Sequence, residues 1–390
     1  MYPNLYYAFK DLFGIELPFL RFVNSFGFFV AIAFIVSAIV LANELRRKSK
    51  QGLFQPTEMQ VMVGQPATFL DLGLNFLLGF LLGYKIVALF IMDSSATEDP
   101  QAFIFSSLGS WPAGIGLGLL FAGLKWWEKN KQKLDKPEKR TVRIWPHDRV
   151  GEITILALVF GLLGAKLFDI FENWSDFLKH PSDHIFSAKG LTFYGGLICA
   201  ALAIWWYARK HKIGFWHLND ALAPTMMLAY SMGRIGCQVS GDGDWGIANT
   251  SPKPFSWMPD WMWSYRYPHN VNEVGEKIPG CTDTKFCNQL EVGVYPTPFY
   301  EIVVCFILFL VLWSLRRKLK VPGTIFALYL MLNGLERFFI EKIRVNTTMN
   351  FMGLTVTQAE VISSILFLSG LFLWIFLSRG AKSQQKISKS

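Results

Sequence analysis

The sequence predicts an all-α polytopic membrane protein that crosses a lipid bilayer about nine times. Hydrophobic residues make up 52% of the chain, and charged residues only 17%. The apolar residues fall in runs of about twenty, the length that an α-helix needs to cross the hydrocarbon core. Several of these runs have little amphipathic period, as expected where lipid covers much of the helix surface. We therefore expect one integral membrane domain over residues 1–390.

Nine candidate spans follow from the apolar runs. They are residues 22–43, 71–92, 111–127, 151–172, 190–208, 217–237, 296–315, 323–342 and 358–378. Every odd-numbered span ends in a basic cluster, and these clusters lie at 46–50, 125–149, 209–212, 316–320 and 379–382 in chain order. Acidic residues follow the second and fourth spans, at Asp93, Glu98, Asp99, Glu172 and Asp176. Because Lys and Arg stay on the cytoplasmic side during insertion, the N-terminus is expected outside and the C-terminus in the cytoplasm.

The net charge of +9 does not indicate a nucleic-acid-binding protein, because the basic residues sit at alternate ends of the apolar runs. The five cysteines include no CxxC pair, so the sequence indicates neither a metal site nor a redox cofactor. Cys281 and Cys287 can form a disulfide if their loop faces an oxidising compartment.

The longest polar segment, residues 238–295, follows the sixth span and is expected on the outer side. It holds four Lys or Arg and seven Asp or Glu, so it lacks the positive bias of a cytoplasmic loop. Its aromatic residues suit the membrane–water interface, where simple anchoring would explain them. They are Trp257, Trp261, Trp263, Tyr265 and Tyr267.

Charged residues within the spans carry the most information, because burying a charge in lipid is costly. In the eighth span, Arg337, Glu341 and Arg344 are spaced four and three apart and so share one helix face. One interpretation is an internal Arg337–Glu341 salt bridge that neutralises itself. The other is a polar site formed together with neighbouring helices.

Three other spans bring polar groups to the same outer depth. They contribute Arg234 at the end of the sixth span, Glu301 at the start of the seventh, and Tyr194 before Gly195 and Gly196 in the fifth. Arginines with few carboxylates nearby suit a phosphate, because guanidinium binds its oxygens bidentately and keeps its charge when desolvated. At that depth the phosphate would belong to a phospholipid headgroup of the outer leaflet.

The segment 233–246, Gly-Arg-Ile-Gly-Cys-Gln-Val-Ser-Gly-Asp-Gly-Asp-Trp-Gly, is rich in glycine. Such backbone is tolerated at membrane depth where it lines a cavity. This segment resembles the signature of the prolipoprotein diacylglyceryl transferase family. The blocks 164–167 (GAKL), 190–196, 295–301 (YPTPFYE) and 337–344 resemble further family motifs in the same order, so the resemblance covers most of residues 150–378.

The resemblance implies an enzyme of the bacterial inner membrane, with its active site toward the periplasmic leaflet. Such an enzyme moves the sn-1,2-diacylglyceryl group of phosphatidylglycerol to the lipobox cysteine of a prolipoprotein. A thioether forms and glycerol phosphate leaves. Catalytic roles are implied for Arg234, Arg337, Tyr194 and Glu341. Substrate-binding roles are implied for Arg234, Arg344, Gly195, Gly196, Asp242, Gly246, Glu301 and Lys166. No cofactor or metal is implied, and the chain is expected to be monomeric.

Several positions depart from the family pattern. Tyr194 stands where His is usual, so Tyr194, Glu341 or water remains open as the acceptor of the thiol proton. Cys237 and Ser240 replace two asparagines, and Asp242 replaces Glu with one extra residue before Gly246. In addition, Lys166 and Phe26 replace Arg and Tyr.

Two other functions stay open from the residues alone. One is a transporter or flippase for anionic lipid or solute that uses the same arginines, with Lys85 and Lys166 as its charges nearer the cytoplasm. The other is a non-catalytic homologue. The family resemblance implies a core of seven helices, so residues 71–127 are interpreted as an inserted helical hairpin.

Overall fold

The computed structural model describes residues 1–91, 103, 106–181, 185, 192–281, 285–346, 348–351 and 354–387. Within it the chain divides into two compact units, each described here by itself. The first unit comprises Met1–Ala8, Asn24–Phe54 and Ala208–Ser390, and the second comprises Phe9–Val23 and Gln55–Tyr207.

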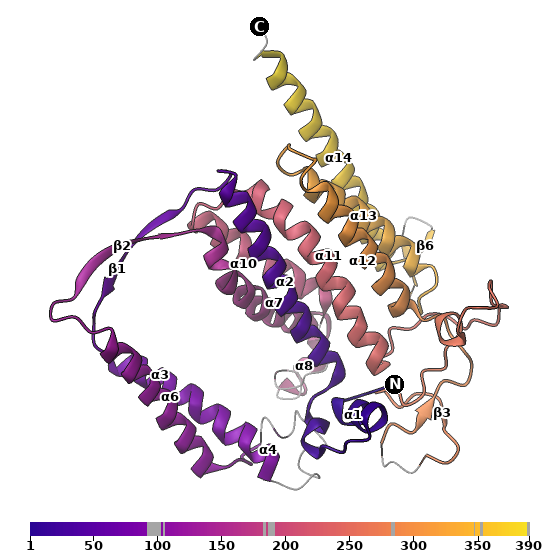
Figure 1. Cartoon of the computed structure of the whole chain (residues 1–390). Helices are drawn as coiled ribbons and strands as arrows, with labels where there is room; N and C mark the ends of the chain where they lie inside the picture. The colour runs from indigo at the N-terminus through magenta and orange to yellow at the C-terminus, as the bar shows by residue number, and fades with distance from the viewer. Residues whose placement is uncertain are drawn as a thin grey trace. The chain divides into compact units, whose positions relative to one another are not determined.

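Five long helices form the body of the first unit (Figure 1). They are α2(Ser25–Lys50), α11(Phe215–Ser240), α12(Thr297–Leu315), α13(Thr324–Glu341) and α14(Gln358–Ile387). Helix α11 packs against α2, α12 and α13, and α13 packs along α14. The α13–α14 contact is close because Gly334 and Gly370 lack side chains. A Cβ at Gly334 would lie 2.6 Å from the carbonyl oxygen of Ser363.

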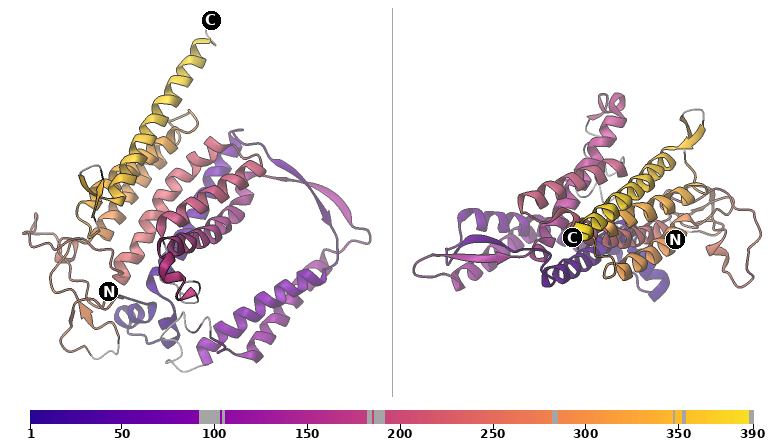
Figure 2. Two further views of the ribbon diagram at one scale, coloured as in Figure 1. Left: turned by 180° about the vertical axis from the view of Figure 1, so that it is seen from behind. Right: turned by 90° about the horizontal axis from the view of Figure 1, so that it is seen from above.

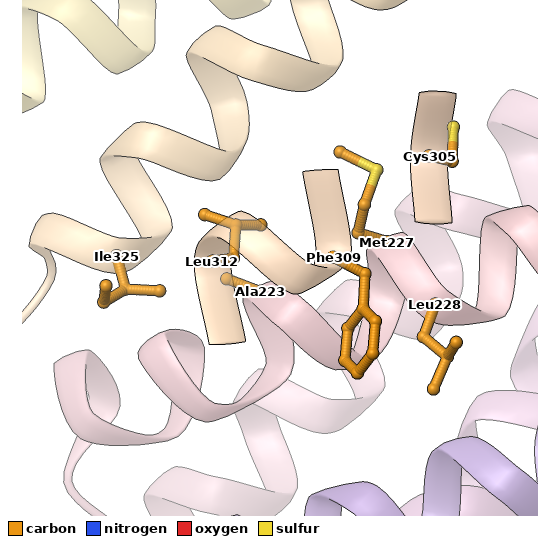
Figure 3. Close-up of a cluster of buried hydrophobic side chains, with 7 residues drawn as sticks. All are labelled: Ala223, Met227, Leu228, Cys305, Phe309, Leu312 and Ile325. Carbon is orange, nitrogen blue, oxygen red and sulfur yellow. The ribbon is translucent and has the colours of Figure 1, made fainter. Parts of the chain in front are cut away.

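A buried apolar cluster joins three of these helices (Figure 3). Its members are Ala223, Met227 and Leu228 of α11, Cys305, Phe309 and Leu312 of α12, and Ile325 of α13. Since each helix contributes to one cluster, the cluster sets the spacing of α11, α12 and α13.

Polar contacts also join the helices at the ends that lie away from Arg234 and Arg337. The carboxylate of Asp220 accepts hydrogen bonds from the backbone N–H groups of Gly323 (2.7 Å) and Phe326 (3.0 Å). It thereby caps the start of α13, where backbone donors have no partner within the helix. Glu44 of α2 forms ion pairs with Arg47 and, at 2.9 Å, with Arg316.

The polar segment between α11 and α12 is folded on itself. It contains η5(Asp260–Met262) and the antiparallel strands β3(Glu276–Lys277) and β4(Asn288–Gln289). The pairing of Cys281 and Cys287, which the sequence left open, is present as a disulfide. Tyr267 is fully buried against Leu290 and Val294. Strands β5(Thr348–Phe351) and β6(Leu354–Thr357) connect α13 to α14.

The second unit contains a helical hairpin that is connected at both ends to a two-stranded antiparallel ribbon (Figures 1 and 2). The hairpin is α3(Phe69–Leu82), the π-helical turn η2(Gly83–Val87), α4(Ala88–Ile91) and α6(Trp111–Lys131). The ribbon pairs β1(Thr57–Val63) with β2(Glu138–Ile144). The remaining elements are η1(Pro18–Phe22), η4(Pro146–Arg149), α7(Val150–Glu172), α8(Trp174–Phe177) and α10(Phe193–Lys210). Helix α1(Leu5–Phe13) spans the boundary between the units.

Glycines on both helices let the hairpin close tightly. Gly79 and Gly83 of α3 and η2 face Gly114 and Gly118 of α6, so each side carries a Gly-x-x-x-Gly spacing. A Cβ at Gly79 would lie 2.5 Å from the carbonyl oxygen of Leu117. Close backbone packing is therefore the physical role of these glycines.

Five of the described helices are long and apolar enough to cross a membrane. They cover Ser25–Lys50, Phe69–Phe90, Pro146–Glu172, Thr297–Leu315 and Gln358–Gly380. The chain is thus a mostly helical, multi-pass membrane protein. Helices α6, α10, α11 and α13 coincide with the other four predicted spans. Residue 92 of the predicted second span, Asp93, Glu98 and Asp99, and residues 190–191 of the predicted fifth span lie outside the described residues.

The hairpin packing makes a testable prediction. Replacing Gly79 by Ala should lower the melting temperature of the purified protein in detergent, because overpacking of this kind costs about 1–3 kcal/mol. Gly73→Ala on the same helix is the matched control, since a Cβ at Gly73 meets no atom within 4 Å. Equal melting temperatures for the two variants would contradict this packing.

Candidate active site

Three arginines converge at one end of the helices of the first unit. Arg234 lies in the last two turns of α11, and Arg337 lies in the last turns of α13. Arg344 follows three residues after the end of α13. The sequence predicted that Arg234, Arg337, Glu301 and Tyr194 lie at one depth. The structure brings Arg234, Arg337 and Glu301 together and adds Arg344 to them.

Glu301 is the carboxylate common to all three arginines. It lies near the start of α12, and its side chain is 0% exposed. It forms ion pairs with the Nε atom of Arg234 and, at 3.4 Å each, with Nη1 of Arg337 and Nη1 of Arg344. Such pairing is required, because an uncompensated charge in the interior would cost several kcal/mol.

Two further carboxylates complete the cluster. Asp244 contacts Arg234 through Oδ2 and Nη2 of Arg344 through Oδ1, the latter at 2.6 Å. Glu341 pairs with Arg337 at 3.1 Å and accepts a hydrogen bond from the side chain of Asn346. We define the arginine cluster as Arg234, Arg337, Arg344, Asp244, Glu301 and Glu341.

The composition of the arginine cluster corrects one expectation. The sequence predicted arginines with few carboxylates nearby, but each arginine is paired with at least two. The internal Arg337–Glu341 salt bridge, one of the two interpretations of α13, is present together with the inter-helix contacts. The site therefore holds its arginines in place before any ligand arrives.

The two aspartates of the glycine-rich segment have different environments. Burial and the neighbouring charge of Asp244 raise the pKa of Asp242. Burial also acts to raise the pKa of Asp244, but Arg234 and Arg344 outweigh it and hold that pKa below its ordinary value. The sequence selected Asp242 for substrate binding, whereas the carboxylate that contacts the arginines is Asp244. Among the described contacts, Asp242 accepts a hydrogen bond from the backbone N–H of Asp244.

Gly246 brings the loop against Arg344. The two residues form an isolated antiparallel bridge, and the N–H of Ile247 donates to the carbonyl of Ile343 at 2.9 Å. A Cβ at Gly246 would lie 2.4 Å from that same carbonyl oxygen, so no other residue fits without displacing the chain. Its role is close backbone approach, which positions Arg344 beside Asp244.

Four predicted site residues belong to the second unit. Lys166 on α7 pairs with Asp169 at 3.9 Å, and Tyr194 lies in the first turn of α10. Gly195 and Gly196 pack on α7: a Cβ at Gly196 would lie 2.8 Å from the carbonyl oxygen of Gly161. Helix packing therefore accounts for this glycine pair, and a role of these four residues in the site stays a proposal.

Glu301 generates a prediction about stability. Glu301→Gln should destabilise the folded protein by about 3–5 kcal/mol, because it leaves three arginine charges facing only the two carboxylates of Asp244 and Glu341. The drop in melting temperature in detergent measures this effect. Glu276→Gln is the control, since Glu276 pairs with Arg266 and both side chains are more than 40% exposed. A similar drop in melting temperature in both variants would contradict the claim that the buried ion pairs of Glu301 stabilise the fold.

Known proteins resemble this chain over most of its length. The model of the family described as prolipoprotein diacylglyceryl transferase matches residues 113–376. A protein of Dehalococcoides mccartyi is 30% identical, over 74% of this chain and 98% of its own length. A protein of Clostridium novyi is 30% identical over 58% of this chain and 79% of its own, and one of Clostridioides difficile is 29% identical over 62% and 83%.

All three relatives carry the name phosphatidylglycerol–prolipoprotein diacylglyceryl transferase. The match of the family model includes every member of the arginine cluster, from Arg234 to Arg344. The resemblance seen in the sequence motifs is thereby confirmed, and this chain belongs to the prolipoprotein diacylglyceryl transferase family.

Proposed function

We propose that this chain transfers the sn-1,2-diacylglyceryl group of phosphatidylglycerol to the cysteine thiol of a prolipoprotein. The product is a thioether, and glycerol phosphate is released. Membership of the family and the names of the relatives support this function. The structural observation that carries it is the meeting of Arg234, Arg337 and Arg344, from three parts of the chain, around shared carboxylates.

The chemistry requires stabilisation of a leaving phosphate. The sulfur of the prolipoprotein cysteine attacks the glycerol carbon that bears the phosphodiester oxygen. A carbon–sulfur bond forms, the carbon–oxygen bond breaks, and its electron pair goes to the phosphate. Cations fixed in advance stabilise the charge that develops there. Arg234 and Arg337 are proposed to bind this phosphate, and Arg344 to take part in binding the substrate.

The thiol proton needs an acceptor, although a free thiol with a pKa of about 8.5 makes this a modest demand. Tyr194, Glu341 and water are the candidates. Glu341 already contacts Arg337 and Asn346, which suits a residue that orients Arg337. Lys166, Gly195, Gly196 and Asp242 are retained as proposed substrate-binding residues, and their role rests on the family resemblance.

The proposed topology has nine spans, an outer N-terminus and a cytoplasmic C-terminus. The alternation of basic and acidic clusters supports it. On this topology the loop 238–295 is periplasmic, and the Cys281–Cys287 disulfide agrees with an oxidising compartment. The active site then faces the periplasmic leaflet of the bacterial inner membrane. We further propose a monomer with a seven-helix core, into which residues 71–127 are inserted as a hairpin.

The local partners of two lysines, Lys85 and Lys166, argue against a transporter that uses the same arginines. Lys85 donates to three backbone carbonyls, of Phe103, Ser106 and Leu108, at 2.7–2.9 Å. Lys166 has Asp169 nearby. Since both lysines have local partners, neither supports a path of charges from the arginine cluster to the other side of the membrane.

The proposal predicts that replacing either arginine by lysine, which keeps the charge, strongly lowers the transfer activity. Arg234→Lys and Arg337→Lys should each lower transfer of labelled diacylglycerol to a lipobox peptide roughly 100- to 1000-fold, because lysine cannot reproduce the bidentate contacts. Arg266→Lys is the control, since Arg266 lies in the outer loop and pairs with Glu276. Full activity of both cluster variants would exclude this function, as would failure of the wild type to complement a transferase-depleted strain.

Tyr194→Phe tests the proton acceptor. If the phenol accepts the thiol proton, kcat should fall about 100-fold or more with KM little changed, as expected for loss of a general base. The rise of kcat with pH that deprotonation of the phenol would cause should also be lost. If the variant turns over at the wild-type rate, Tyr194 is not the base, and Glu341 or water takes its place.

A further inference from the structure

Asp244 differs from the other carboxylates of the arginine cluster in position and exposure. Glu301 and Glu341 stand on helices, and their side chains are 0% and 1% exposed. Asp244 stands on the loop that follows α11, and its side chain is 36% exposed. Asp244 is therefore the carboxylate on the open side of the cluster.

The two oxygens of Asp244 are divided between two arginines. Oδ2 contacts Nη1 of Arg234, and Oδ1 lies 2.6 Å from Nη2 of Arg344. The phosphodiester of a lipid likewise presents two non-ester oxygens that share one negative charge. Guanidinium groups bind carboxylate and phosphate oxygens in the same manner. Asp244 thus matches a lipid phosphate in charge and in the number of acceptor oxygens.

The cluster does not depend on Asp244 alone. Arg234 and Arg344 both pair with Glu301 as well, through other nitrogen atoms than those that contact Asp244. If Asp244 moved away, each arginine would keep a buried carboxylate partner. The donors set free would be Nη1 of Arg234 and Nη2 of Arg344, which point at the position that the Asp244 carboxylate had occupied.

Hydrogen bonds hold the backbone at Asp244 and just after it, whereas the side chain is partly exposed. Its carbonyl accepts a hydrogen bond from the hydroxyl of Thr297 at 2.7 Å. Two residues later, the N–H of Gly246 donates to the carbonyl of Tyr295 at 2.8 Å. Release of the arginines then needs only a change between staggered side-chain rotamers.

Building on the proposed function, we propose that Asp244 is a placeholder for the phosphate of the lipid substrate. Its carboxylate bridges Arg234 and Arg344 in the empty site and turns away when the phosphodiester enters. An anionic headgroup replaces the lost contacts, whereas a neutral lipid does not. Asp244 is thus a positioning residue that holds both arginines beside the phosphate position and makes the site selective for anionic lipids.

Asp244→Asn tests the proposal, because the amide keeps the shape and removes the competing charge. KM for phosphatidylglycerol should fall roughly three- to tenfold, as expected from the worth of a partly exposed ion pair. Inorganic phosphate should inhibit at proportionally lower concentration. Asp244→Glu, which restores the charge, should return both values toward wild type. An unchanged or higher KM in Asp244→Asn would overturn the proposal, as would a fall in kcat alone.

A matched control and a second measurement separate this proposal from the proposed function. Asp260→Asn changes another outer-loop aspartate, which pairs with Lys253 and is 84% exposed, and should leave KM unaltered. Inorganic phosphate should raise the melting temperature of Asp244→Asn at lower concentration than that of the wild type. This measurement needs no turnover, so it tests Asp244 even if transfer is absent. If the variant and the wild type need the same phosphate concentration for this rise in melting temperature, the placeholder proposal is wrong.

Discussion

The arrangement of the first unit depends on one fully buried carboxylate. Glu301 pairs with three arginines that come from α11, from α13 and from the segment after α13. Neither the carboxylate nor the arginines would be stable alone at that depth, because the cost of desolvating an unpaired charge exceeds the stabilisation from packing. The carboxylate therefore determines which ends of the three helices meet. It also explains how a site for an anionic headgroup can be cationic and yet folded in the absence of that headgroup.

The helices have to place these charged side chains at the same level along their axes. The apolar cluster of α11, α12 and α13 sets their spacing, and the Asp220 carboxylate caps α13 at the end away from the arginines. Buried apolar surface is non-directional, whereas the cap and the ion pairs are directional. Spacing thus comes from packing, while the height of Arg337 relative to Glu301 comes from the polar contacts at both ends of α13.

The loop after α11 supplies what the helices lack. It carries Asp244, whose side chain is partly exposed, unlike those of Glu301 and Glu341, and its backbone is hydrogen-bonded at Gly246 and to Thr297. The two carboxylates that helices contribute to the cluster, Glu301 and Glu341, are buried. A loop residue on a fixed backbone combines a defined position with side-chain freedom, which is what a replaceable contact to an anionic ligand requires.

The sequence by itself determined the helical membrane class, because runs of about twenty apolar residues have few other solutions. It also determined the family, through the segment 233–246 and the motifs on either side of it. Because helical spacing is local, it determined the shared face of Arg337 and Glu341 as well. Only the tertiary structure decided that Asp244 rather than Asp242 meets the arginines. Both alternate with glycines in Gly-Asp-Gly-Asp, and the choice depends on contacts with Thr297 and Arg344, 53 and 100 residues away. The β1–β2 ribbon and the paired glycines of α3 and α6 were likewise visible only once distant segments were brought together.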